Sequence, residues 1–179
     1  NHLRSCKNDR GNDILYICSL HSERAQILNQ LKSFCAENNF SYKAFLYEKK
    51  YIFMKRKYLD HQKEYQAVEN KDMTFKSLSL TDIYNLYGVS KVVLDYTHPG
   101  QTGFTMRTIE SLGNKCKLIT NNQEIKNADF YDERNIFVYD NKNFHVPSSF
   151  IQSPFYEEEK NAYELYSLDN WLMTLFNKG

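Results

Sequence analysis

Short apolar runs alternate with segments of helical periodicity along most of this chain. The predicted strands are residues 14–18, 42–47, 73–75, 92–94, 116–120 and 136–139, and the predicted helices are 22–38, 79–87, about 103–112 and 157–177. Continuous apolar runs are typical of strands covered on both faces, and strands that alternate with helices favour a parallel sheet. Since crossovers are right-handed, the doubly wound form follows. We therefore predict a Rossmann-like α/β fold, with a parallel sheet of about six strands, helices on both faces and a C-terminal helix packing back.

The length of 179 residues suits one domain. Residues 1–12 are polar and are interpreted as a lead-in, so we expect a single domain over residues 13–179. No internal repeat or low-complexity linker divides this stretch. Because the sequence does not begin with Met, we expect it to be a fragment that a partner domain precedes in the full protein.

Charge and composition argue against several classes of protein. The 23 basic and 22 acidic residues give a formal net charge of +1, so we expect no nucleic-acid partner. No apolar run approaches the roughly 20 residues that cross a bilayer, and the first residues lack the apolar core of a signal peptide, so we expect a soluble, cytoplasmic protein. The four cysteines lack the spacing of a zinc site or a disulfide framework.

Residues 48–70 mix aromatic and charged side chains without a clean period and fit an irregular amphipathic helix. Basic residues gather at 49–50 and 55–57. Such a cluster either keeps a helix face in water or contacts an anion or a membrane surface. The sequence leaves both interpretations open, and with them a peripheral association with a membrane.

The clearest strand, 92–94, runs into the loop 97–103. In open parallel sheets ligands bind outside the carboxyl ends of strands, where loops and helix amino-termini meet. Pro99 and Gly100 shape a turn, and Gly103 allows a ligand to approach the backbone closely. The following helix offers unpaired N–H groups to an anion such as a diphosphate. The glycine fingerprint of dinucleotide-binding folds and the P-loop are both missing, and an ordinary strand-to-helix turn is the alternative.

Arg107 and Glu110 are three residues apart on the predicted helix and therefore share a face. In one interpretation they form an intrahelical ion pair, which stabilises little. In the other, the Glu110 carboxylate accepts hydrogen bonds from the two hydroxyls of a ribose and Arg107 lies near phosphate. The sequence does not decide between the two.

The run 93–113, VLDYTHPGQTGFTMRTIESLG, resembles a family of bacterial polysaccharide-biosynthesis proteins. The family's pattern contains Gln-x-Gly-Leu-Thr-Met-Arg-x-Ile-Glu-x-Leu-Gly, and this chain departs from it mildly, with Phe104 in place of Leu. Residues 117–122 continue the likeness, and a weaker likeness covers nearly the whole domain. These proteins are similar to the carboxyl-terminal, donor-binding half of two-domain GT-B glycosyltransferases, so the resemblance implies that this chain is the carboxyl-terminal half of a longer two-domain protein.

The resemblance implies roles for residues around the loop. Glu110 occupies the position at which a glutamate of such proteins binds the ribose of the donor. The other candidates for binding the donor lie in the loops after the first and fourth predicted strands and are Gln101, Thr102, Gly103, Ser19 and Arg24. The candidate catalytic residues are His98, which would face the transferred sugar, and Arg107, near the phosphate.

The function implied is nucleotide-sugar binding by a hexosyltransferase-like enzyme of bacterial lipopolysaccharide, capsule or other cell-surface polysaccharide biosynthesis. Such a transfer requires no metal and no cofactor, because positioned amides and a cation can stabilise the departing diphosphate. The acceptor, a glycan or lipid-linked glycan, would be bound by an amino-terminal domain, and a lipid acceptor would place the enzyme at the inner face of the cell membrane. The alternative is a non-catalytic protein-interaction module with the same fold.

Overall fold

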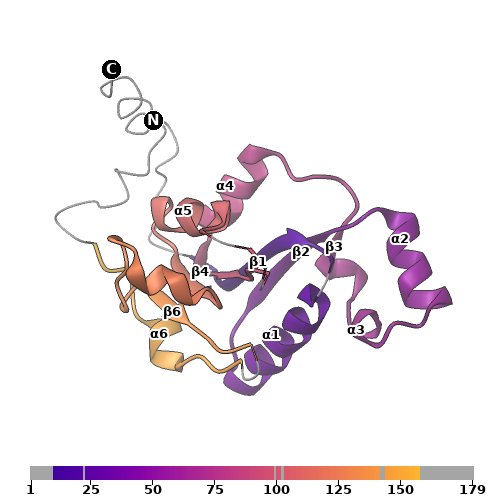
Figure 1. The fold of residues 1–179 in the computed structure, drawn as a ribbon, viewed down its shortest axis with the longest axis horizontal. Coiled ribbons are helices and arrows are strands. Elements are labelled where there is room, and N and C mark those ends of the chain that lie inside the picture. The colour runs from indigo at the N-terminus through magenta and orange to yellow at the C-terminus, as the bar shows by residue number, and fades with distance from the viewer. Residues whose placement is uncertain (1–9, 22, 99, 102, 142–143, 158–179) are drawn as a thin grey trace.

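The computed structural model describes residues 10–21, 23–98, 100–101, 103–141 and 144–157. Its centre is one sheet of six parallel strands in the order β3-β2-β1-β4-β5-β6 (Figure 1). The strands are β1 (Asn12–Ser19), β2 (Tyr42–Tyr47), β3 (Met73–Thr74), β4 (Ser90–Asp95), β5 (Lys117–Thr120) and β6 (Ile136–Val138). The predicted C-terminal helix, most of the lead-in and Thr102 lie outside the described residues.

Helices cover both faces of the sheet, which confirms the predicted doubly wound form. The α-helices are α1 (Arg24–Asn38), α2 (Lys50–Met54), α3 (Lys63–Gln66), α4 (Leu80–Gly88), α5 (Met106–Gly113) and α6 (Ser148–Gln152). Three further helical segments are the π-helix η1 (Lys55–Leu59) and the 3₁₀-helices η2 (Asn70–Asp72) and η3 (Gln123–Asn127). Figure 1 shows α4 and α5 on one side of the sheet and α1 and α6 on the other. No helix among the described residues is long and apolar enough to cross a membrane.

The core explains why the strands are apolar on successive residues. On β1, Ile14 and Tyr16 belong to the core cluster that includes the buried side chains of α1. Leu15 and Ile17 belong to the opposite cluster, which includes Tyr87 of α4. Because the side chains of a strand alternate between faces, a strand buried on both sides needs an apolar residue at every position.

The helix after β4 begins later than predicted. It starts at Met106 rather than near Gly103, because the Thr105 hydroxyl oxygen takes the N-cap position and accepts the backbone N–H of Thr108 at 3.2 Å. Gly103 instead lies in the loop with a φ of 87°, a conformation that favours glycine.

Residues 48–70 form several helical pieces instead of one irregular helix. The pieces are α2, η1, α3 and the start of η2, and His61 separates the second from the third. His61 has a φ of 48°, which no helix continues through. The short segments α6 and η3 are the other elements that the sequence pattern did not predict, because neither spans two full turns of a longer periodic stretch.

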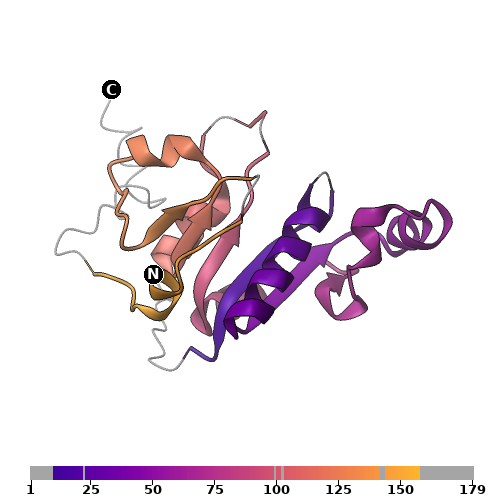
Figure 2. The same ribbon diagram turned by 90° about the horizontal axis from the view of Figure 1, so that it is seen from below.

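The strand order reverses between β1 and β4, which lie side by side in the middle of the sheet. The chain leaves β1 toward α1 on one face and leaves β4 toward α5 on the other, as Figures 1 and 2 show. Loops that part in this way open a crevice at the carboxyl ends of the two strands. The fold therefore places a candidate site at this edge.

Candidate functional site

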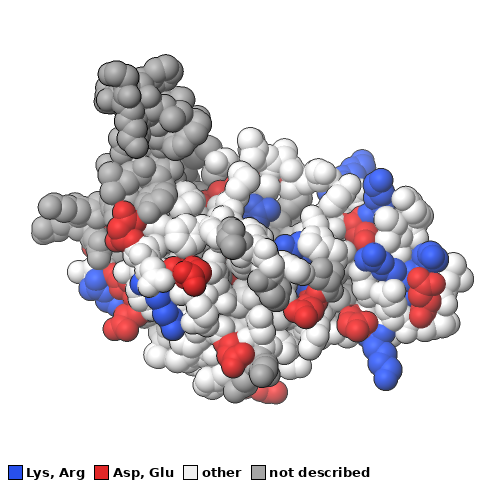
Figure 3. All heavy atoms as spheres, viewed as in Figure 1, with Lys and Arg blue, Asp and Glu red and all other residues white. Residues whose placement is uncertain are grey.

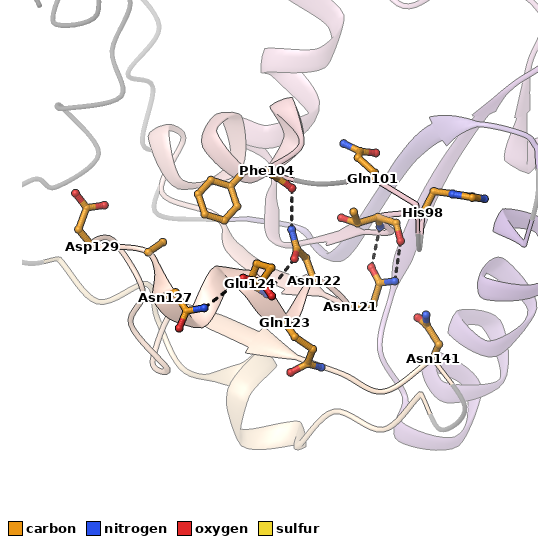
Figure 4. Close-up of a pocket in the computed structure, with 13 residues that line it drawn as sticks. His98, Gln101, Phe104, Asn121, Asn122, Gln123, Glu124, Asn127, Asp129 and Asn141 are labelled. Atoms are coloured by element: carbon orange, nitrogen blue, oxygen red, sulfur yellow. Dashed lines mark hydrogen bonds between the residues drawn. The ribbon is translucent and has the colours of Figure 1, made fainter.

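An open pocket of about 990 Å³ lies at the carboxyl ends of β4, β5 and β6 (Figure 4). Its lining is dominated by side-chain amides, from Gln101, Asn121, Asn122, Gln123, Asn127 and Asn141. Glu124 and Asp129 add acidic groups and Phe104 adds a ring, whereas no described Lys or Arg lines it. Amides both donate and accept hydrogen bonds, so this lining suits an uncharged ligand rich in hydroxyl groups better than an anion.

Two asparagines after β5 hold the loop that follows β4. The Asn121 side chain accepts the backbone N–H of Thr97 at 2.7 Å and donates to the carbonyl oxygen of the same residue at 2.8 Å. Asn122 donates through Nδ2 to the carbonyl oxygen of Gly103 at 3.0 Å. The predicted ligand loop is thus tied to its neighbour at both ends, as the dashed lines in Figure 4 show.

His98 lines the pocket from within this loop. Its Nδ1 accepts the backbone N–H of Gly100 at 3.2 Å, and its carbonyl oxygen accepts the N–H of Gln101 at 2.8 Å. In the neutral ring, a nitrogen that accepts carries no proton, so Nε2 holds it. The exposed edge of His98 is therefore a hydrogen-bond donor.

Asp95 closes the base of the same loop. Its Oδ2 accepts the Thr105 hydroxyl at 2.6 Å, so the residue that caps α5 is itself held by the end of β4. Burial raises the pKa of Asp95, although the Thr105 hydrogen bond and the charge of Arg107 oppose the shift. One N–H of the first helical turn is already used by Thr105, which leaves the other backbone amides of this end for a ligand.

Arg24 lies where the loops after β1 and β4 part, in contact with His21 and near His98. Arg24 donates to the carbonyl oxygen of Ser19 at 3.2 Å and also contacts the ring of His21. Burial lowers the pKa of His21, and Arg24, His98 and Arg56 lower it further. In the part of the chain that the structure describes, Arg24 forms no ion pair, so its charge is available to an anion.

Buried polar side-chain atoms without a hydrogen-bond partner gather at this edge of the sheet. Seven such atoms occur among the described residues. Five of them belong to residues in or after the loops at the carboxyl ends of strands, namely Arg24 (Nε), Glu48 (Oε2), Thr97 (Oγ1), Tyr139 (OH) and Asn141 (Oδ1). Buried polar groups in native proteins are nearly always satisfied, so such a cluster points to a place where a bound molecule or water completes the structure.

Arg107 and Glu110 form the ion pair that their spacing allows. The Arg107 Nη1 lies 2.7 Å from the Glu110 Oε2, and the Tyr87 hydroxyl donates to that same oxygen at 2.9 Å. Arg107 also lines a smaller pocket, of about 190 Å³, together with Ser19. The carboxylate is therefore oriented from two sides through Oε2, and its Oε1 is not used by either contact.

The structure brings only part of the predicted site together. His98, Gln101 and Gly103 share the large pocket, whereas Ser19 and Arg107 line the small one. Arg24 follows the loop after β1 and contacts His21, which in turn lies near His98. Glu110 is paired with Arg107.

Apart from Gln101, sequence reasoning missed the amides of the large pocket. A signal for two of them was present, because Asn121 and Asn122 directly follow the predicted strand 116–120, at the carboxyl end where ligands bind. Asn141 follows β6 in the same way but is separated from it by two residues.

The fold and the placement of these pockets define a Rossmann-like α/β domain with its candidate site at the carboxyl edge of the sheet. Among solved structures, the chain is similar to the GtfA/B complex at 16% identity, with a TM-score of 0.52 over 99% of this chain and 31% of the other. It is also similar to the C-terminal domain of a glycosyl transferase group 1 family protein, LpcC from Francisella tularensis, at 14% identity, with a TM-score of 0.49 over 74% of this chain and 69% of the other. No protein-family model and no curated protein matches the sequence. The likeness to the GtfA/B complex shows a shared fold.

Proposed function

We propose that this chain is the donor-binding domain of a glycosyltransferase and holds a nucleotide-sugar at the carboxyl edge of its sheet. The observation that carries the proposal is the junction between the Arg24 guanidinium at the end of β1 and the amide-lined pocket beside β4 and β5. A nucleotide-sugar has the same two-part chemistry, an anionic diphosphate joined to an uncharged ring of hydroxyl groups.

The diphosphate would lie at the β1–β4 crevice. Arg24 provides a guanidinium without an ion pair among the described residues, and the ring of His98 presents an Nε2–H donor from the facing loop. The backbone amides of Thr102 and Gly103 are proposed to meet the phosphate oxygens, whereas Gln101, whose own N–H donates to the carbonyl oxygen of His98, would contribute its side-chain amide. Fixed donors of this kind stabilise charge that develops on a departing diphosphate, so the scheme needs no metal and no cofactor.

The sugar would extend into the amide-lined pocket, where its hydroxyls can pair with Asn141, Gln101 and the neighbouring amides. Thr97 and Asn141 each contribute a buried oxygen that no described residue satisfies. The donor ribose would pair with Glu110, through the Oε1 that neither Arg107 nor Tyr87 occupies. We propose bacterial cell-surface polysaccharide or lipopolysaccharide as the product, on the strength of the resemblance of residues 93–113, with a glycan or lipid-linked glycan acceptor bound by another domain at the inner membrane face.

Calorimetric titration of the 179-residue chain with UDP, GDP and CMP tests the proposal. We expect saturable binding of one nucleotide, weakened at least about tenfold by Arg24→Gln, which corresponds to about 1.4 kcal/mol. The matched control is Arg134→Gln, because Arg134 pairs locally with Asp132 just ahead of β6, at the opposite edge of the sheet.

Binding that both arginine variants weaken equally would show that the contact is general electrostatic attraction. A folded protein that binds none of the three nucleotides at millimolar concentration would contradict the proposal and favour the protein-interaction module instead.

A further inference from the structure

The helical stretch after β2 exposes apolar side chains to an unusual degree. Tyr51, Met54, Tyr58 and Leu59 are 68%, 44%, 50% and 74% exposed. They are four of the eight large exposed hydrophobic residues in the described part of the chain, within nine positions. Their spacing along α2 and η1 places them on one side of the helix.

Two basic residues of the same stretch, Arg56 and Lys57, point toward the domain instead. Arg56 donates to the Glu48 carboxylate at 3.1 Å and to the Tyr65 hydroxyl at 2.6 Å. Lys57 donates to the carbonyl oxygen of Val68, and its ammonium lies 5.6 Å from the centre of the Phe53 ring. Phe53 is buried toward the domain as expected of an amphipathic helix, but two cations share this inner side while four large apolar side chains face outward.

Lysines surround the apolar side chains. Residues 49–63 hold six basic residues and one acidic residue. Lys49, Lys50 and Lys63 are exposed and form no ion pair with any described residue, and Lys55 lies 3.9 Å from Asp60. Glu48, Asp60 and Glu64 are the acidic residues of positions 48–64, and Glu48 is paired with Arg56, so basic residues outnumber acidic ones there by six to three. Figure 3 shows basic side chains, with acidic ones among them, over the end of the molecule that carries α2.

We propose that this outer face binds the surface of an anionic lipid bilayer, where the outer face means Tyr51, Met54, Tyr58 and Leu59 with Lys49, Lys50, Lys55 and Lys63. Tyr, Met and Leu partition into the boundary between headgroups and acyl chains, while lysines pair with lipid phosphates and reach them along flexible stems. The combination of protruding apolar side chains with a rim of cations is the pattern of an interfacial amphipathic segment.

The shape of the protein favours a bilayer as the partner of the outer face over an acidic groove on another protein. Figures 1 and 2 show α2 and α3 projecting beyond β3 at one end of the molecule, so a flat surface can reach the outer face without meeting the sheet. The stretch leaves β2 at its carboxyl end, which is also the edge that carries the amide-lined pocket. The inference stands on these contacts and charges and does not depend on nucleotide-sugar binding.

Sedimentation with lipid vesicles tests the inference on the whole chain. Vesicles of equal parts phosphatidylglycerol and phosphatidylcholine are expected to carry the protein down, pure phosphatidylcholine vesicles are not, and added salt is expected to weaken the binding. The variant Lys49→Gln/Lys50→Gln/Lys55→Gln should lower the affinity about tenfold or more. The variant Tyr58→Ser/Leu59→Ser should lower it by a similar factor.

Matched controls distinguish binding by the outer face from non-specific adsorption of the protein to vesicles. Lys126→Gln changes an exposed lysine on η3, and Leu80→Ser changes a leucine on α4 that is 67% exposed. Both should bind vesicles within about twofold of the wild type. If the double variant unfolds at a lower temperature than the wild type, Tyr51→Ser replaces it in the test. The Tyr51 side chain is 68% exposed, so its loss should not destabilise the fold. The inference is wrong if the protein does not bind anionic vesicles, or if the controls lose as much affinity as the variants. Binding to heparin, a soluble polyanion, without binding to vesicles would also contradict it.

Discussion

Asn121 joins the carboxyl ends of β5 and β4 by forming two hydrogen bonds with the backbone of Thr97, at 2.7 and 2.8 Å. One side chain thereby satisfies both backbone polar groups of a buried residue at the point where the chain turns into the candidate ligand loop. A loop pinned in this way presents His98 and Gln101 in a defined position without help from a ligand.

Replacing Asn121 should therefore affect both stability and binding. Asn121→Ala removes two hydrogen bonds and leaves the amide and carbonyl of Thr97 unsatisfied, so we expect a loss of about 2 kcal/mol in the free energy of unfolding. Urea denaturation measures it, and nucleotide titration should show weaker binding. Asn85→Ala is the control, because Asn85 is an exposed residue of α4 that does not line the pocket. Equal losses in the two variants would contradict a special role for Asn121.

Glu110 should be needed for the nucleotide and not only for its ion pair. Glu110→Ala is expected to weaken nucleotide binding at least about tenfold, because it removes the carboxylate proposed to meet the ribose. Tyr87→Phe is the matched control, since it removes one hydrogen bond to Oε2 and keeps the carboxylate. Titration calorimetry compares them. If Glu110→Ala keeps its affinity and only unfolds more easily, the ion pair with Arg107 is the whole role of the residue.

Lys117 should stabilise the packing of α6 on the sheet. Its buried ammonium donates to the Phe150 carbonyl oxygen at 2.6 Å and to the Ser153 hydroxyl at 2.5 Å, and it lies 4.2 Å from the centre of the Phe150 ring. Lys117→Met keeps the stem but leaves these acceptors unpaired, and we expect a loss of roughly 2 kcal/mol in urea denaturation. The exposed control Lys126→Met should change stability by less than about 0.5 kcal/mol.

The stability of the protein in acid should depend on Asp13. Partial burial by itself raises the pKa of this carboxyl, but hydrogen bonds from Lys91, at 2.7 Å, and from Ser41 outweigh it and hold the pKa below its ordinary value of 3.8. The carboxylate therefore stabilises the fold above about pH 3.8, and this contribution is lost as the pH falls through the lowered pKa.

We expect Asp13→Asn to be less stable than the wild type by roughly 1 kcal/mol at pH 7 and to converge with it below pH 3.8. Urea denaturation over a pH series gives the comparison, with the exposed Asp60→Asn as control. A constant difference at all pH values would mean that the carboxylate charge contributes nothing.

The helix α5 illustrates how far sequence patterns reach into the site. Its existence follows from apolar spacing that ends at Gly113. The role expected for Glu110, which lies on this helix, follows from the resemblance of residues 93–113. Its start does not, because Thr105 becomes the cap only when Asp95 accepts its hydroxyl at 2.6 Å. The pair of Arg107 with Glu110 was one of two open interpretations, and the Tyr87 hydroxyl that orients it comes from another helix.

The sequence by itself determined the six strands and their parallel pairing, and it predicted the edge where a ligand would bind. The strands depend on short continuous apolar runs, because each strand buried on both faces must carry its own apolar run. Only the tertiary structure decided that Asn121 holds Thr97, that Arg24 stands beside His21, and that Leu59 points outward while Arg56 points inward. Those contacts join positions that are distant in the chain or turn on helix geometry, and their energies exist only once the packed sheet brings the partners together.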